Sequence, residues 1–400
     1  MGLGRTPHRA RDHRRGRGGA RGGSPILTPV FVGSEIYRHS SYGAWHPLRI
    51  PRVSTVTDLA RALGWLPADR FRTSPRARAA ALTVWHSPAY VAALEEAERR
   101  QQVDAATRAR HGLGTPSNPV FPEMFRRPAT GVGGVMLAAE LLREGGVAHV
   151  PGAGTHHALP DRASGFCYLN DPVFAVLALR AQGARRVAYV DLDAHHGDGV
   201  ELAFRDDPHT LVLSVHEEGR WPGTGALADR GAGQVWNLPV PRGFHDDDMA
   251  RVLDHLILPV VEAFGPDAVV LQCGADGLLE DPQSGLALSN NAHAAAVAAI
   301  RPLSPRLLLL GGGGYNPWSV ARCWTRLWGI LAGERAPGTL PDSARAVLAG
   351  LRWMRRGSGR AIEPEMRWID TLEDPPRGGL PSSEVRARLG MLRARLRVWQ

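Results

Sequence analysis

A short apolar run that ends in a cluster of ionisable side chains constrains the fold of this chain more than any other feature. Residues 186–199 read Arg-Val-Ala-Tyr-Val-Asp-Leu-Asp-Ala-His-His-Gly-Asp-Gly. The first half is typical of a strand that is buried on both faces of a parallel sheet. In such sheets ligands bind at the carboxyl ends of the strands, where the polar half lies. The stretch therefore predicts an α/β fold with a functional site at one edge of its sheet.

The rest of the chain repeats this order of strand, polar loop and helix. Further strands are predicted at residues 29–33, 147–150, 210–216, 267–273 and 306–310. Helices are predicted at residues 54–65, 87–100, 129–145, 171–182, 200–204, 247–264, 292–301, 317–331 and 382–400. Residues 104–124 and 217–243 are predicted to be long loops. Because buried strands alternate with helices, we expect one mostly parallel sheet with helices on both faces.

The composition divides the chain into three parts. Residues 1–25 form an Arg- and Gly-rich tail, which we expect to be disordered, and seven of its arginines contribute to the net charge of +9. Residues 26–335 are predicted to form one domain, and residues 336–400 a helical extension packed on it. The tail could contact nucleic acid, but a solvated tail is the simpler interpretation. We therefore expect no nucleic-acid partner.

Several features place the protein in the cytoplasm. No apolar run approaches the roughly 18–20 residues that cross a bilayer, so no membrane partner is expected. The first residues lack the apolar segment of a secretory signal. Three cysteines lack the spacing of a metal site, and a disulfide framework is not expected. The sequence predicts no particular oligomeric state.

The polar residues after the central strand have the spacing of a metal site. Asp191, Asp193 and His195 lie at i, i+2 and i+4, so in an extended segment their side chains point the same way. Asp193 and His195 are ordinary ligands for zinc or a similar divalent ion, with Asp191 beside them as a supporting group. A catalytic zinc needs a third protein ligand. Asp276 follows another buried strand and could supply it, although a single Asp there is more often a helix cap.

Three further loops carry candidate groups. His156 and His157 form a tandem pair suited to acid–base chemistry near neutral pH, unless one of them caps or packs. Residues 164–171 read Ser-Gly-Phe-Cys-Tyr-Leu-Asn-Asp and are equally well explained as a turn that enters a helix. Residues 311–315 read Gly-Gly-Gly-Gly-Tyr. They lack a phosphate-binding pattern, and the alternative is a close backbone approach that places Tyr315 over a site.

Together these motifs resemble the histone deacetylase family, which includes bacterial acetoin-utilisation deacetylases and acetylpolyamine amidohydrolases. The resemblance covers residues 30–331. It rests on His-His-Ala, Gly-Phe-Cys-Tyr-Leu-Asn-Asp, Asp-Leu-Asp-Ala-His-His-Gly-Asp-Gly, Gly-Ala-Asp and Gly-Gly-Gly-Gly-Tyr, which occur in the family's order. It implies the arginase/deacetylase fold, a single domain with an eight-stranded parallel sheet between helices.

The resemblance also implies a role for each polar position. The ligands of a Zn²⁺ ion, or of Fe²⁺, would be Asp193, His195 and Asp276. The catalytic groups would be His156, His157, Asp191, Asp198 and Tyr315. The substrate would contact Gly165, Phe166 and Trp221. A K⁺ ion would bind near Asp191 and Ser214, and Arg52 would line an acetate-release pocket.

These roles predict one mechanism. His157 would be the general base and acid, oriented by Asp198. His156, kept charged by Asp191, would act electrostatically. Tyr315 would donate a hydrogen bond to the oxyanion.

The predicted function is metal-dependent hydrolysis of an acetyl-amide, with acetyl-lysine in proteins as the expected substrate. The alternative is a small acylated amine such as an acetylpolyamine. Ser117 stands where many peptide deacetylases have an Asp that grips the substrate backbone, which leaves room for this alternative. Glu217 and Glu218 could supply the acidic mouth that a polyamine hydrolase needs.

Two further classes fit the sequence less well. A ureohydrolase resembling arginase would need a second Asp beside Asp276. A binding module that has lost its activity is disfavoured because all the catalytic residues are present.

Overall fold

Eight parallel strands form one sheet in the part of the chain that the computed structural model describes, which is Met1, residues 28–354 and residues 360–399. Their order across the sheet is β2-β1-β3-β8-β7-β4-β5-β6. The strands are β1 Val30–Gly33, β2 Phe71–Thr73, β3 Gly146–Val150, β4 Val187–Asp191, β5 Thr210–Glu217, β6 Val235–Val240, β7 Ala268–Gln272 and β8 Arg306–Leu310. The predicted eight-stranded parallel sheet is therefore confirmed.

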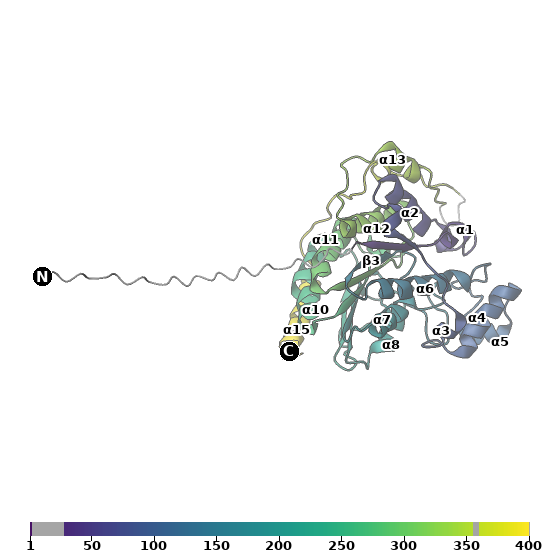
Figure 1. Ribbon diagram of the computed structural model, residues 1–400, viewed down its shortest axis with the longest axis horizontal. Coiled ribbons are helices and arrows are strands. Elements are labelled where there is room, and N and C mark those ends of the chain that lie inside the picture. The colour runs from purple at the N-terminus through teal and green to yellow at the C-terminus, as the bar shows by residue number, and fades with distance from the viewer. Residues whose placement is uncertain (2–27, 355–359, 400) are drawn as a thin grey trace.

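Helices cover both faces of this sheet (Figure 1). One face carries α3 Ala79–Leu82, α4 Pro88–Arg100, α5 Ala105–His111, α6 Arg126–Leu141, α7 Asp171–Ala181 and α8 Asp198–Phe204. The other carries α2 Val53–Ala62, α9 Asp246–Val252, α10 Leu258–Phe264, α11 Asn290–Ile300, α12 Pro317–Ala332, α13 Asp342–Ala349, α14 Met366–Asp370 and α15 Ser383–Trp399. The short α1 Ile36–His39 follows the first strand. Two hydrophobic clusters, one on each face, form the core.

The central strands are apolar on both faces because helices cover both sides. All five residues of β4 and of β7 are buried, and the two strands pair in register from Val187 opposite Ala268 to Asp191 opposite Gln272. Such strands read as continuous apolar runs rather than alternating ones, which is why their positions are visible in the sequence.

One edge strand and one helix lie in predicted loops, and the other edge strand lies where no element was predicted. The predicted loop at residues 217–243 was wrong because it contains β6, whose Pro239 is tolerated at the edge of the sheet, where a backbone N–H is not needed. At the other edge, β2 is only three residues long. The loop predicted at residues 104–124 contains α5, which begins at Asp104, whose carboxylate accepts the Thr107 N–H at 2.7 Å.

The helix predicted at residues 247–264 is present but interrupted. Its middle, Leu253–Ile257, is a π-helical turn between α9 and α10. The next helix has a proline in its first turn. Pro lacks the N–H that a regular α-helix would use there, and a π turn is one way to accommodate that loss.

The last helix packs along the β6 edge of the sheet. The Trp399 ring of α15 contacts Trp236 and Phe264 at centroid distances of 5.2 and 6.4 Å. Arg395 lies over the Trp236 ring and donates to the carbonyl of Val235 at 2.7 Å. A buried ion pair between Arg322 and Asp374, at 2.7 Å, holds the segment before this helix. An edge strand covered in this way cannot pair with another chain.

The tail predicted at residues 1–25 lies, apart from Met1, outside the described residues. Among the helices that the structure describes, none combines the length and the apolar character that a membrane crossing requires.

Candidate active site

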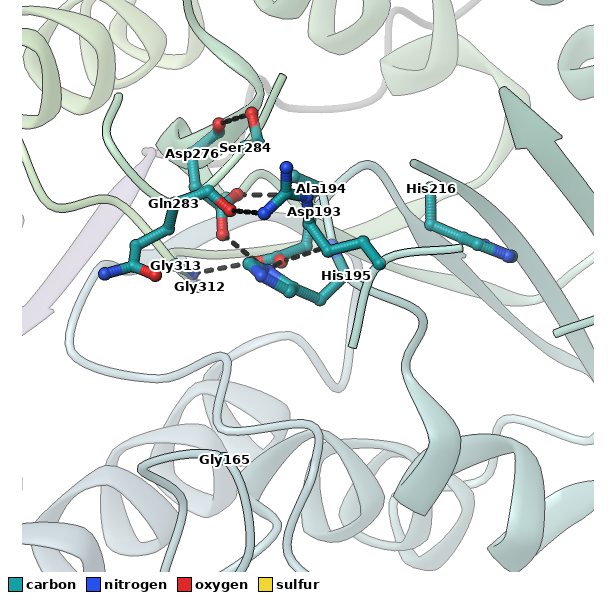
Figure 2. Close-up of polar contacts among 12 residues, drawn as sticks. Gly165, Asp193, Ala194, His195, His216, Asp276, Gln283, Ser284, Gly312 and Gly313 are labelled. Atoms are coloured by element: carbon teal, nitrogen blue, oxygen red, sulfur yellow. Dashed lines mark hydrogen bonds and ion pairs between the residues drawn. The ribbon is translucent and has the colours of Figure 1, made fainter. Parts of the chain in front are cut away.

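Three metal-ligand side chains converge where β4 and β7 end. Asp193 and His195 follow β4, and Asp276 follows β7, its neighbour in the sheet. Their ligand atoms lie within 4.8 Å of one another. The His195 Nδ1 atom is 3.1 Å from Asp193 Oδ1 and 2.9 Å from Asp276 Oδ2, so the imidazole lies between the two carboxylates (Figure 2). Two Asp and one His make a three-donor set that fits a divalent metal with an open position.

The electrostatics of this cluster favour a bound cation. Burial and the facing carboxylate of Asp193 raise the pKa of Asp276. The imidazoles of His156 and His195 overcome burial and hold the pKa of Asp193 below its usual range. Burial lowers the pKa of His195, but its bonds to both carboxylates outweigh burial and raise it to about 10. Two buried carboxylates therefore hold positive charge between them, and a metal would replace the imidazole proton on binding.

Glycines let the backbone approach these carboxylates closely. The Gly313 N–H donates to Asp193 Oδ2 at 2.6 Å (Figure 2). A Cβ atom on Gly313 would overlap Asp276 Oδ2, and one on Gly274 would overlap Asp193 Oδ2. This contact supports the close-approach interpretation of the four-glycine run and leaves no phosphate cradle at that position.

His156 belongs to a buried hydrogen-bond network behind the cluster. Its Nδ1 atom is 2.8 Å from Asp191 Oδ2, which also accepts the hydroxyl of Tyr189 at 2.6 Å. Burial alone would lower the pKa of His156, but Asp191 and Asp193 together raise it to about 9. The imidazole is therefore charged at neutral pH. Tyr189 was not among the predicted site residues, although it precedes Asp191 by two residues and so shares its face of the strand.

His157, in contrast, is neutral at the same pH. Its Nδ1 atom is 2.7 Å from Asp198 Oδ1, and its ring lies 3.9 Å from the His156 ring. Burial, reinforced by repulsion from His156, lowers the pKa of His157 to about 3. The predicted histidine–carboxylate pairs are thus both present in the geometry, with one imidazole charged and its neighbour neutral.

Tyr315 reaches the cluster from the loop after β8. It lines the same cavity as His157 and His195, and burial raises the pKa of its hydroxyl well above the usual range. Its backbone N–H donates to Asp281 Oδ2 at 2.6 Å, and this carboxylate also accepts the Gln283 N–H at 2.9 Å. Asp281 was missed because its partner is 34 residues away in sequence, and no local pattern marks it.

The walls of the cavity include the predicted substrate contacts. A cavity of about 720 Å³ opens from His157 and His195 past Gly165, Phe166 and Trp221. The Trp221 ring packs against the His157 ring at 4.6 Å and covers Gly165, where a Cβ atom would overlap the indole. Phe166 has a φ of +68°, an uncommon conformation for a residue with a side chain, and Tyr42 donates to its carbonyl at 3.2 Å.

A second, smaller cavity of about 30 Å³ lies at the inner end. It shares His157, Phe166 and Tyr315 with the larger cavity and is also lined by Arg52. The Arg52 guanidinium donates to the carbonyl of Gly312 at 2.8 Å and stacks over the Trp324 ring at 5.3 Å. This is a position from which it could contact a small product.

Ser214 lies outside both cavities. It is the register partner of Asp191 on the neighbouring strand, and both residues are buried. Its hydroxyl is 2.9 Å from His216 Nδ1, while the Asp191 carboxylate accepts hydrogen bonds from Tyr189 and from the Asp193 N–H at 3.0 Å. The two predicted potassium ligands are thus adjacent on neighbouring strands.

Comparisons with known proteins agree on one family. Residues 46–331 match the histone deacetylase domain. The chain is 32% identical over 326 residues to the acetoin utilization protein AcuC of Bacillus subtilis, covering 77% of this chain and 84% of that protein. It is 38% identical over 310 residues to histone deacetylase 3 of Oryza sativa subsp. japonica, covering 75% of this chain. That match covers 60% of the rice protein, so the chain spans about three fifths of its length.

A solved structure supports the same assignment. The histone deacetylase homologue of Aquifex aeolicus superposes with a TM-score of 0.85 at 34% identity, covering 92% of this chain and 100% of that one. The domain match, the relatives and the shared fold lead to one conclusion: this chain belongs to the histone deacetylase family.

Proposed function

We propose that this protein is a metal-dependent deacetylase that hydrolyses the acetyl-amide of acetyl-lysine in proteins. One observation carries the proposal. The three-donor cluster of Asp193, His195 and Asp276 meets a neutral His157 and the Tyr315 ring at the inner end of a single open cavity. This arrangement contains a metal position, a base and an oxyanion donor, which are the groups that amide hydrolysis requires.

A divalent ion bound to this cluster would polarise the amide carbonyl and lower the pKa of a water molecule. His157 is neutral and its Nδ1 side is bonded to Asp198, so its Nε2 can take the proton of the attacking water. The same atom then donates that proton to the leaving amine. His156 stays charged beside it and stabilises negative charge that develops on the substrate.

Tyr315 is the second stabilising group. Its hydroxyl is not ionised, because burial raises its pKa, so it remains a hydrogen-bond donor toward the carbonyl oxygen as negative charge develops there. Asp281 positions this residue through the backbone N–H. Trp221 and Phe166 exclude water from the flanks of the extended side chain that enters the cavity.

The test is acetate release from an acetyl-lysine peptide and from acetylated putrescine, measured with metal-stripped and zinc-reloaded protein. We expect turnover of the peptide only after zinc is restored. The Asp276→Asn variant, in which a neutral amide replaces one anionic ligand, should regain little activity at the same zinc concentration. If the zinc-loaded protein released no acetate from either substrate, the proposed activity would be refuted. If it hydrolysed only acetylated putrescine, the substrate would be a small acylated amine and not a protein.

Several finer points belong to the same proposal. Zinc is the expected metal, with ferrous iron as the alternative, because Asp and His donors suit both. Potassium near Asp191 and Ser214, a cytoplasmic location and the division into a tail, a domain and a C-terminal extension remain predictions.

A further inference from the structure

The mouth of the substrate cavity contains two acidic side chains, and both are already paired. Glu217 forms an ion pair with Arg220, whose second nitrogen lies 3.1 Å from Glu217 Oε1. The same carboxylate accepts the Gly285 N–H at 2.8 Å. Arg220 also donates to the carbonyl of Gln283 at 2.6 Å, and both residues line the cavity. This pair therefore adds no net charge to the mouth.

Glu218 is paired with a residue from a distant part of the chain. Both of its carboxylate oxygens lie 2.8 Å from the same guanidinium nitrogen of Arg388, which comes from α15. Arg388 is anchored further by its bonds to the carbonyl of Pro239, at 2.6 Å, and to Glu384. Each Glu at the mouth therefore has an Arg against it, which weakens the negative charge that a polyamine hydrolase would need there.

One charged side chain at the mouth has no acidic partner. Arg162 lines the cavity and is exposed. One of its terminal nitrogens donates to the carbonyls of Ala109 and Arg110, at 2.9 and 3.2 Å. Among the residues that the structure describes, it forms no ion pair with a carboxylate, and its remaining N–H groups have no protein acceptor.

The rest of this wall is polar but uncharged. Thr115, Ser117, Asn118 and Ser164 line the cavity together with Arg162. Ser117 therefore brings no negative charge, and the wall as a whole carries one positive charge. A carboxylate on a substrate would find a hydrogen-bond donor and a positive charge there, and an ammonium group would be repelled.

We propose that Arg162 makes the mouth select acetyl-amides that carry a carboxylate beside the reacting side chain, and disfavour acetylpolyamines. The preferred substrate class is an acetyl-lysine peptide with an acidic neighbouring residue. This inference rests on the proposed function, because it names the substrate of the same site. Arg162 contributes to specificity here through its charge and its free N–H groups, and takes no part in the chemical step.

The experiment compares zinc-loaded full-length protein on three acetyl-lysine tripeptides that differ only in one neighbour, Asp, Asn or Lys. We expect kcat/KM to fall in that order, with Asp about three- to fivefold above Asn, as for a single partly exposed ion pair. The Asp-to-Asn ratio should shrink toward one at high salt, since screening weakens such pairs.

Variants assign the effect to one residue. Arg162→Gln should bring the Asp-to-Asn ratio close to one, and Arg162→Lys should retain most of it because the charge remains. Arg110→Gln removes an exposed positive charge from the adjacent helix outside the cavity lining and should leave the ratio unchanged. Glu218→Gln leaves Arg388 without its partner at the mouth and should raise the ratio.

The outcomes separate the two proposals. If the wild-type protein hydrolyses none of the peptides, the proposed function is wrong. If it hydrolyses all three but the Asp-to-Asn ratio is one, or is the same in Arg162→Gln, the proposed function stands and the role of Arg162 is refuted. A ratio that Arg162→Gln abolishes and Arg162→Lys restores would support the inference even if both variants lose some overall activity.

Discussion

At the scale of single residues, the hydroxyl of Tyr315 is the group whose removal tests the mechanism most directly. We expect Tyr315→Phe to lower kcat by about 10²–10³-fold with little change in KM, because the hydroxyl acts on charge that develops during the reaction. Steady-state kinetics on an acetyl-lysine peptide would measure this. Tyr90→Phe is the matched control, because its hydroxyl bonds the carbonyl of Tyr168 outside both cavities. Unchanged kcat in Tyr315→Phe would remove this residue from the mechanism.

A second residue affects stability rather than catalysis. His149 of β3 is fully buried, packs edge-on against Phe31 at 5.5 Å, and neither ring nitrogen has a hydrogen-bond partner among the described residues. Burial lowers its pKa from 6.5 to about 3. Between these values the unfolded chain binds a proton that the folded protein does not, so stability is fully present above pH 6.5 and falls as the pH decreases.

The variant His149→Leu should lose less stability in acid. It removes one group that binds a proton in the unfolded chain. When the pH is lowered from 7.5 to 5, the free energy of unfolding should therefore fall by ~2 kcal/mol less in the variant than in the wild type. Urea denaturation at both pH values would measure the difference. His86 and His216, whose pKa values are also lowered by burial, remain in both proteins. The variant should therefore still lose some stability in acid, but less than the wild type. Equal pH dependence in the two proteins would contradict this account.

At the scale of elements, the glycine loop after β8 holds the two metal-binding carboxylates. We expect Gly313→Ala to weaken zinc affinity by about 10–100-fold, because the added Cβ would displace Asp276 and disturb the N–H bond to Asp193. Competition with a chromophoric chelator would report the affinity without depending on turnover. Gly338→Ala is the control, since nothing lies within 4 Å of the added atom. Equal zinc affinity in all three proteins would show that the loop does not hold the ligands.

At the scale of the whole molecule, the C-terminal helix closes one edge of the sheet. We expect Leu389→Ala to lower the free energy of unfolding by about 2–5 kcal/mol, because Leu389 is buried against the main core. Met391→Ala, on the same helix but 64% exposed, should change it by less than about 0.5 kcal/mol. Chemical denaturation followed by circular dichroism would compare them. Equal, small effects would mean that α15 does not dock on the body in solution.

The same helix also links stability to specificity. Arg388 lies on α15, and it pairs with Glu218 at the mouth of the substrate cavity. This helix lies beyond residue 331, where the match to the deacetylase domain ends. The charge of the mouth is therefore set in part by a segment outside the family domain.

The sequence by itself determined the positions of the buried strands and the chemistry at their ends. The central strands are continuous apolar runs, so both their location and the polar residues that follow them are local properties. Asp193 and His195 could be predicted to act together because side chains two residues apart on an extended chain point to the same side. The two edge strands escaped prediction because β2 is short and β6 contains a proline, which is unusual in a strand.

Only the tertiary structure decided which of these groups meet. Asp276 reaches His195 across 81 residues of sequence, and Arg388 reaches Glu218 across 170. From the sequence alone Glu217 and Glu218 could have formed an acidic mouth, whereas in the fold each is paired with an Arg, and Arg162 has no carboxylate partner among the described residues. Such pairings depend on how helices and strands pack, because distant side chains are brought together by the burial of the core and not by any local pattern.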